Sequence, residues 1–163
     1  MLRYCAAASV VLLLAGCETT AGPGSWTPPP PPPPAAATLT GHDGVQAATG
    51  ARGSCAGYSV AVMADTPAMR QRMVALYGSA ERAIARVSVV KARSAKLPAG
   101  EPPEAAAPCD TRGDFSLGGL APGSYFLIAR VSLTPQRAGE REYVIMRHVL
   151  LRRGETREVT LIP

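Results

Sequence analysis

The stretch from Asp110 to Leu127 reads DTRGDFSLGGLAPGSYFL and decides the fold class of the chain. Gly113 permits a positive φ in a tight turn, and the alternation that starts at Phe115 is typical of a short strand with one buried face. Pro122 and Gly123 suit the two central positions of a type II turn. The stretch therefore predicts two strands that enter one core, from Asp114 to Leu117 and again after a turn over 118–123.

Alternating strands continue on the C-terminal side of this stretch. We expect strands over Ser124–Leu133, Tyr143–Leu151 and Thr156–Ile162, with a hairpin turn at Arg153–Glu155. Consecutive short strands joined by Gly and Pro turns favour an all-β sandwich.

The N-terminal side of the stretch predicts one further strand and a helix. Tyr58–Met63 alternates as a strand does. Asp65 or Thr66 can cap a helix that starts at Pro67 and runs to Tyr77, with apolar side chains at helical spacing, and Gly78 can end it. The folded part is expected to begin near Cys55.

The segment over 79–95 fits both a helix and a strand. Ala80, Ile84 and Val87 have helical spacing, whereas the β-branched content favours a strand. We expect a helix or turn first and then a strand from about Arg86 to Arg93. The next segment, Leu97–Pro108, is rich in proline and is expected to be a long loop.

The central stretch resembles the signature of the carboxypeptidase regulatory-like, or prealbumin-like, domain. In that family an Asp-x-x-Gly-x-Phe turn and strand lead to a Leu-x-Pro-Gly-x-Tyr turn and strand. The matching residues are Asp110, Gly113, Phe115, Leu120, Pro122, Gly123 and Tyr125. The resemblance covers most of residues 55–163, although the usual opening Gly-x-Val-x-Asp strand is not recognisable. It implies a small Greek-key-like β-sandwich, with one short helix inserted after the first strand, and an accessory role without a catalytic site.

The N-terminus has the layout of a secretory signal. Arg3 precedes an apolar run over Ala6–Leu14, which is too short to span a membrane. The run ends in Leu-Ala-Gly-Cys, which resembles a bacterial lipobox; we expect residues 1–16 to be a signal peptide and Cys17 to be lipidated. Acyl chains would anchor the mature protein to a membrane. Glu18, in place of the aspartate associated with inner-membrane retention, favours the outer membrane, facing the periplasm or the cell surface.

Residues 17–54 are expected to be a spacer. An unbroken run from Pro28 to Pro34 adopts an extended rod of about 20 Å at the polyproline rise. A proline-rich ligand for a partner domain is the alternative. The folded domain would then occupy residues 55–163, a length that suits a single core.

The cysteines predict one disulfide bond. Cys5 leaves with the signal peptide and Cys17 is modified, which leaves Cys55 and Cys109 as a pair in an oxidising compartment. Two buried thiols are the alternative.

Charge and chemistry narrow the function. The net charge is +5 without a long basic run, so we read the arginines mainly as a solvated face and expect no nucleic-acid partner. The two histidines, His42 and His148, form no ligand cluster, and no nucleophile elbow occurs, so we expect neither a metal, a cofactor nor an enzyme. A structural or protein-interaction module of the envelope is the first hypothesis. A carbohydrate-binding module is the alternative, weakened because Trp26 lies in the spacer.

Overall fold

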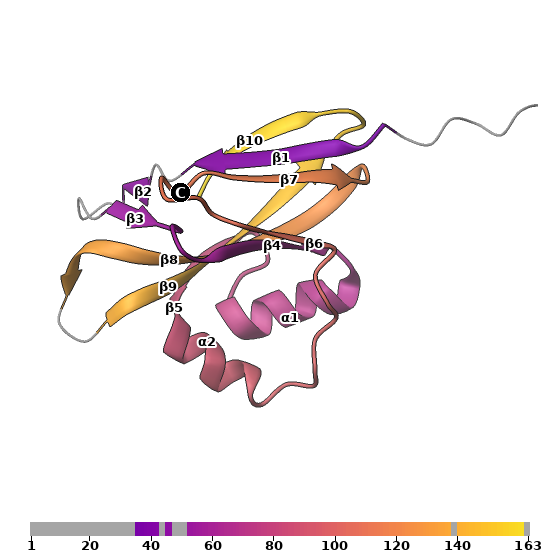
Figure 1. Cartoon of the computed structure of the whole chain (residues 1–163). Coiled ribbons are helices and arrows are strands. Elements are labelled where there is room, and N and C mark those ends of the chain that lie inside the picture. Colours follow the sequence, from indigo (N-terminus) through magenta and orange to yellow (C-terminus); the bar gives the residue numbers. More distant parts are fainter. Residues whose placement is uncertain (1–34, 43–44, 47–51, 138–139, 162–163) are drawn as a thin grey trace, which may run out of the picture. The chain divides into compact units, whose positions relative to one another are not determined.

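The computed structural model describes residues 35–42, 45–46, 52–137 and 140–161, which form two packed β-sheets (Figure 1). The smaller sheet has the strand order β10-β1-β7, in which β1 runs parallel to β10 and antiparallel to β7. Its strands are β1 (Ala37–His42), β7 (Phe115–Leu120) and β10 (Thr156–Thr160). The all-β sandwich predicted from the sequence is confirmed.

The larger sheet is antiparallel and is built around β8 (Gly123–Arg137). One side of β8 pairs with β9 along most of its length, and the other side pairs with β4 and β3. Beyond these, β5 flanks β9, β6 flanks β4 and β2 flanks β3. The remaining strands are β2 (Val45–Gln46), β3 (Arg52–Ser54), β4 (Ser59–Ala64), β5 (Arg82–Arg86), β6 (Ala105–Pro108) and β9 (Glu140–Leu151).

The main core lies between the two sheets. Successive strand side chains point to opposite faces of a sheet, so Leu127, Ala129 and Val131 of β8 all join this core. They meet Leu39 and Leu117 from the smaller sheet, each at most 3% exposed. The alternation in the sequence thus sets which residues fill the sandwich.

Helix α1 (Pro67–Tyr77) packs on the outer face of the larger sheet (Figure 1). Thr66 caps it, because its Oγ1 accepts a hydrogen bond from the Met69 N–H at 3.1 Å. Gly78, at φ 79°, ends it. The predicted helix and both of its ends are therefore confirmed. Its apolar face joins a second buried cluster of Met69, Met73, Leu76, Phe126 and Met146.

The order predicted for 79–95 is wrong: strand β5 comes first and helix α2 (Val87–Ser94) follows, so the fold has a second helix. The strand forms because β5 pairs in register with β9. In α2, Val90 packs against the second cluster and Arg93 donates to the Leu76 carbonyl at 2.7 Å, at the end of α1. These tertiary contacts outweigh the β-propensity of the valines.

The predicted domain boundary at Cys55 lies too far along the chain, because β1 belongs to the sandwich. Ala37 and Leu39 are fully buried on its inner face. Gly41 continues this face, and a Cβ there would come within 2.5 Å of the Phe115 ring. Because some of these inward residues are as small as alanine and glycine, their sequence pattern did not indicate a strand within the expected spacer of 17–54. Part of that spacer is therefore strand.

Two smaller expectations for the loops also change. Strand β7 continues to Leu120 and β8 begins at Gly123, so most of the turn predicted over 118–123 is strand. The loop predicted over Leu97–Pro108 ends in the short strand β6, which pairs with β4. No helix among the described residues is long and apolar enough to cross a membrane.

The predicted disulfide between Cys55 and Cys109 is confirmed. The Cα atoms lie 5.8 Å apart, and the bond joins residues separated by 54 positions. Cys55 follows β3 and Cys109 follows β6, so the bond ties the segment between β3 and β4 to the segment that leads into β7.

Loss of this disulfide should destabilise the domain substantially. A cross-link over 54 positions restricts the unfolded chain by about 4 kcal/mol on the loop-entropy estimate. We expect Cys55→Ala with Cys109→Ala to lower the free energy of unfolding by about that amount in urea titrations. Reduced wild-type protein is the control and should unfold at the midpoint of the double variant. Equal midpoints for oxidised wild type and variant would contradict this account.

Candidate binding cleft

The residues of the predicted signature build a turn and part of the core. The carboxylate of Asp110 accepts hydrogen bonds from the backbone N–H groups of Arg112 at 2.8 Å and Asp114 at 2.9 Å. The bond from Asp114, followed by that from Arg112, lowers the pKa of Asp110. Gly113 has φ 83°, as the turn requires. The role of Asp110 is therefore to hold the turn before β7.

The second half of the signature is also structural. Leu120 and Tyr125 are buried beside Phe115, and the Tyr125 hydroxyl donates to the Ala121 carbonyl at 2.8 Å. The predicted type II turn at 122–123 is wrong, because the positive φ, 76°, falls at Gly119 while Gly123 starts β8. The predicted lipidation site, Cys17, lies outside the described residues.

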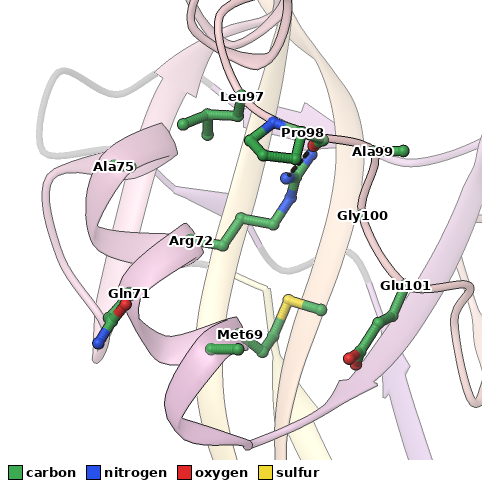
Figure 2. Close-up of a pocket in the computed structure, with 10 residues that line it drawn as sticks. Met69, Gln71, Arg72, Ala75, Leu97, Pro98, Ala99, Gly100 and Glu101 are labelled. Carbon is green, nitrogen blue, oxygen red and sulfur yellow. Dashed lines mark hydrogen bonds between the residues drawn. The ribbon is translucent and has the colours of Figure 1, made fainter.

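A cleft that the sequence did not reveal lies between α1 and the segment Leu97–Glu101 (Figure 2). Its volume is about 460 Å³. The helix contributes Ala68, Met69, Gln71, Arg72 and Ala75, and the segment contributes all five of its residues. A cavity of this size is comparable to small ligand pockets.

Arg72 bridges the two walls of the cleft. Its Nη1 donates a hydrogen bond to the Pro98 carbonyl at 2.7 Å, drawn as a dashed line in Figure 2. Gly100 makes room for this guanidinium, since a Cβ there would lie 3.0 Å from the Arg72 Nε. The contact fixes the segment over the helix and leaves the arginine charge at the cleft.

The chemistry of the lining is mostly apolar. Alanine, methionine, leucine and proline side chains supply most of its surface, and Met69 is almost fully buried. The charged or amide side chains in the lining are Arg72, Gln71 and Glu101. Such a cleft can take an apolar side chain of a bound segment, with one cation, one anion and one amide available for polar contacts.

An ionic cluster fixes the start of α1, and hence the cleft, on the sheet. The Asp65 carboxylate pairs with the Arg70 guanidinium and lies 2.8 Å from the His148 Nε2 on β9. Arg70 also reaches Glu81 at 3.2 Å and lies over the Phe126 ring. Burial raises the pKa of Asp65, but the hydrogen bonds with Arg70 and His148 outweigh it, so this pKa lies below its ordinary value.

A second polar cluster covers the sheet near β4. The Arg130 guanidinium lies 4.8 Å from the centre of the Tyr58 ring and pairs with Glu142, to which the Tyr58 hydroxyl donates at 3.0 Å. The bond from Arg130, then that from Tyr58, lowers the pKa of Glu142. These contacts tie β8, β9 and the start of β4 together.

The aromatic rings of the described residues are all packed against other groups. Phe115, Phe126 and Tyr125 are buried, and Arg130 stacks on Tyr58. Burial raises the pKa of Tyr77 to about 12, and Tyr143 packs against the main core. Within the described part of the chain, the cleft therefore offers no aromatic platform for a sugar ring.

In the region that the structure describes, no group of three or more His, Cys, Asp or Glu side chains is placed so that it could hold a metal ion. Both histidines that the sequence singled out are described. His42 lies on β1 with its Nε2 2.8 Å from the Glu158 carboxylate. His148 is held between Asp65 and Glu81, with its Nδ1 3.8 Å from the Glu81 carboxylate.

Comparison with known proteins supports the fold alone. No family model and no curated protein matches the chain. A crystal structure from Pseudomonas aeruginosa, of a protein named a "putative carbohydrate binding protein", is similar with a TM-score of 0.51. It is 17% identical, and the match covers 80% of this chain and 90% of that one. Such a likeness shows a shared architecture.

The ionic cluster makes a pH-dependent contribution to stability. Because the pKa of Asp65 is lowered by folding, its contribution is present above the ordinary aspartate pKa of about 4 and is lost as the pH falls through the folded value. We expect Asp65→Asn to lower the free energy of unfolding at pH 7 by about 1–3 kcal/mol. The difference from wild type should disappear in urea titrations near pH 2. A constant difference across this range would contradict the assignment. Glu101→Gln, which removes an exposed carboxylate outside the cluster, is the control.

Proposed function

We propose that this chain is a membrane-anchored extracytoplasmic lipoprotein with a non-catalytic protein-interaction sandwich of the carboxypeptidase regulatory-like type. The cleft between α1 and Leu97–Glu101 is the observation that carries the proposal, and it is the surface at which a partner protein binds. Its apolar lining suits an apolar side chain of a protein segment, and Arg72 with Glu101 can fix the orientation of that segment through charge.

Export and anchoring are supported from two independent directions. The Leu-Ala-Gly-Cys end of the signal-like N-terminus supports acylation of Cys17 and its attachment to the membrane, ahead of the proline run. The Cys55–Cys109 disulfide suits an oxidising compartment. Together they favour a location in the cell envelope, at the outer membrane.

Carbohydrate binding is the second candidate, favoured by the name of the similar Pseudomonas aeruginosa protein. It ranks lower because glycan sites commonly use an exposed aromatic face, and the described rings are packed against core residues or Arg130. Tyr143 packs against the main core and Tyr77 against the second buried cluster.

A photocrosslinking experiment in the bacterial host tests the protein-binding cleft. Benzoylphenylalanine replaces Ala75, which lines the cleft, in the full chain. We expect a discrete protein adduct in the membrane fraction, reduced at least tenfold by Ala68→Glu, which places a charge in the apolar lining near the start of the helix. Val74, 49% exposed on the same helix but outside the cleft lining, is the matched control for both the crosslinker and the glutamate.

The same samples separate the candidates. Cys17→Ala should move the chain from the membrane to the soluble fraction, and retention in the membrane would overturn the anchor. Absence of a protein adduct, or an adduct insensitive to Ala68→Glu, would overturn the protein-binding cleft. Saturable glycan binding that Ala68→Glu abolishes would indicate instead that the cleft binds carbohydrate.

A further inference from the structure

Strand β5 forms an open edge of the larger sheet. Among the described residues it pairs with β9 alone. The His148 N–H donates to the Glu81 carbonyl at 2.7 Å, and the register continues from Arg82 opposite Arg147. Hydrogen-bonded pairs alternate along an antiparallel ladder. The backbone groups of Ala83 therefore face β9, and those of Ile84 face outward.

The edge also carries an apolar hollow on the sandwich side. Ile84 and Ile145 lie opposite each other in the register, and with Leu161 they line a cavity of about 280 Å³. Ile145 and Leu161 are buried, whereas Ile84 is 45% exposed. An apolar side chain from an added strand could cover Ile84 here, as Ile145 is covered by the core.

Exposed arginine side chains lie around this hollow. Arg82, Arg86 and Arg147 are all exposed, and their register places them on the same face of the sheet as Ile84. The Arg147 guanidinium donates to the Thr160 carbonyl at 2.8 Å, which is a neutral partner. Glu81 lies one residue before the strand, so it points to the helix face, where it meets Arg70.

A second copy of the chain is a poor occupant of this edge. The strand sequence Arg-Ala-Ile-Ala-Arg over 82–86 is a palindrome. An antiparallel pair centred on Ile84 would therefore place Arg82 opposite Arg86 of the other copy, and like charges directly opposite are destabilising. The same arginines would attract acidic side chains at both positions.

We propose that the β5 edge is a docking site for an extended acidic segment of a partner protein, which adds to the sheet as an antiparallel strand. Its outward backbone bonds are made at Ile84, its central apolar side chain enters the hollow, and flanking carboxylates pair with Arg82 and Arg86. This is strand addition with charge selectivity. This proposal does not depend on the protein-binding cleft, and each of the two proposals is tested by its own experiment.

Peptide titration followed by NMR tests the proposal on the folded, disulfide-bonded protein. The probe is acetyl-Thr-Glu-Ala-Val-Ala-Glu-Thr-amide, and the control peptide has lysine in place of both glutamates. We expect the glutamate peptide to bind and to slow hydrogen exchange of the Ile84 amide at least tenfold. The lysine peptide should leave that amide unchanged.

Two variants separate backbone pairing from charge. Ile84→Pro removes an outward N–H while sparing the β5–β9 ladder, so it should abolish binding, whereas Ile84→Val should retain it. The double charge reversal, Arg82→Glu with Arg86→Glu, should make the protein bind the lysine peptide in preference to the glutamate peptide. This variant tests the charge selectivity even if Ile84→Pro does not fold. No binding of the glutamate peptide at 1 mM, or binding insensitive to the charge reversal, would overturn the proposal. A dimer of the free chain with the Ile84 amide already protected would also overturn it.

Discussion

Strand β8 carries buried apolar side chains on both of its faces, and the rest of the described structure depends on this constraint. Leu127, Ala129 and Val131 face the smaller sheet, while Phe126 faces α1 and is completely buried. A strand in this position must carry apolar residues in succession rather than in simple alternation. The run Tyr125–Ala129 provides them, so one strand belongs to two apolar clusters.

The two faces have different roles. The inner face and the smaller sheet build the sandwich, to which the disulfide adds a covalent restraint. The outer face carries α1 on Phe126 and Met146, and the Asp65–Arg70–His148 cluster fixes where the helix starts. The cleft thus lies on elements that the sheet supports, while the β5 edge lies at the border of the same sheet.

The sequence predicted the features that rest on local chemistry. The strand pattern of β8, the Thr66 cap and Gly78 end of α1, and the single available cysteine pair all specify structure through near neighbours or through compartment chemistry. Strand β1 was missed because its inward residues are as small as Ala37 and Gly41, and the space they fill is set by Phe115, far along the chain. The order of β5 and α2 was missed for a similar reason: pairing with β9 decides it.

The candidate sites depend on such distant contacts even more. Nothing near Arg72 in the sequence indicates that its guanidinium will lie on Pro98 and against Gly100, yet that contact shapes the cleft. The palindrome over 82–86 was visible, but its meaning depends on β5 being an edge. The prediction for Cys17 differs from these, because it depends entirely on a short local pattern, the lipobox-like Leu-Ala-Gly-Cys, and on no distant contact.

Native-state hydrogen exchange in sub-denaturing urea tests most directly whether the sheet carries the helices. The account predicts that the amides of Leu127 and Ile128 in β8 exchange only through global unfolding. Amides of Met73 and Leu76 in α1 should exchange through a smaller opening that leaves β8 protected, because the helix packs on the sheet through one face. Equal opening free energies for helix and strand, or exchange of β8 before α1, would contradict the account.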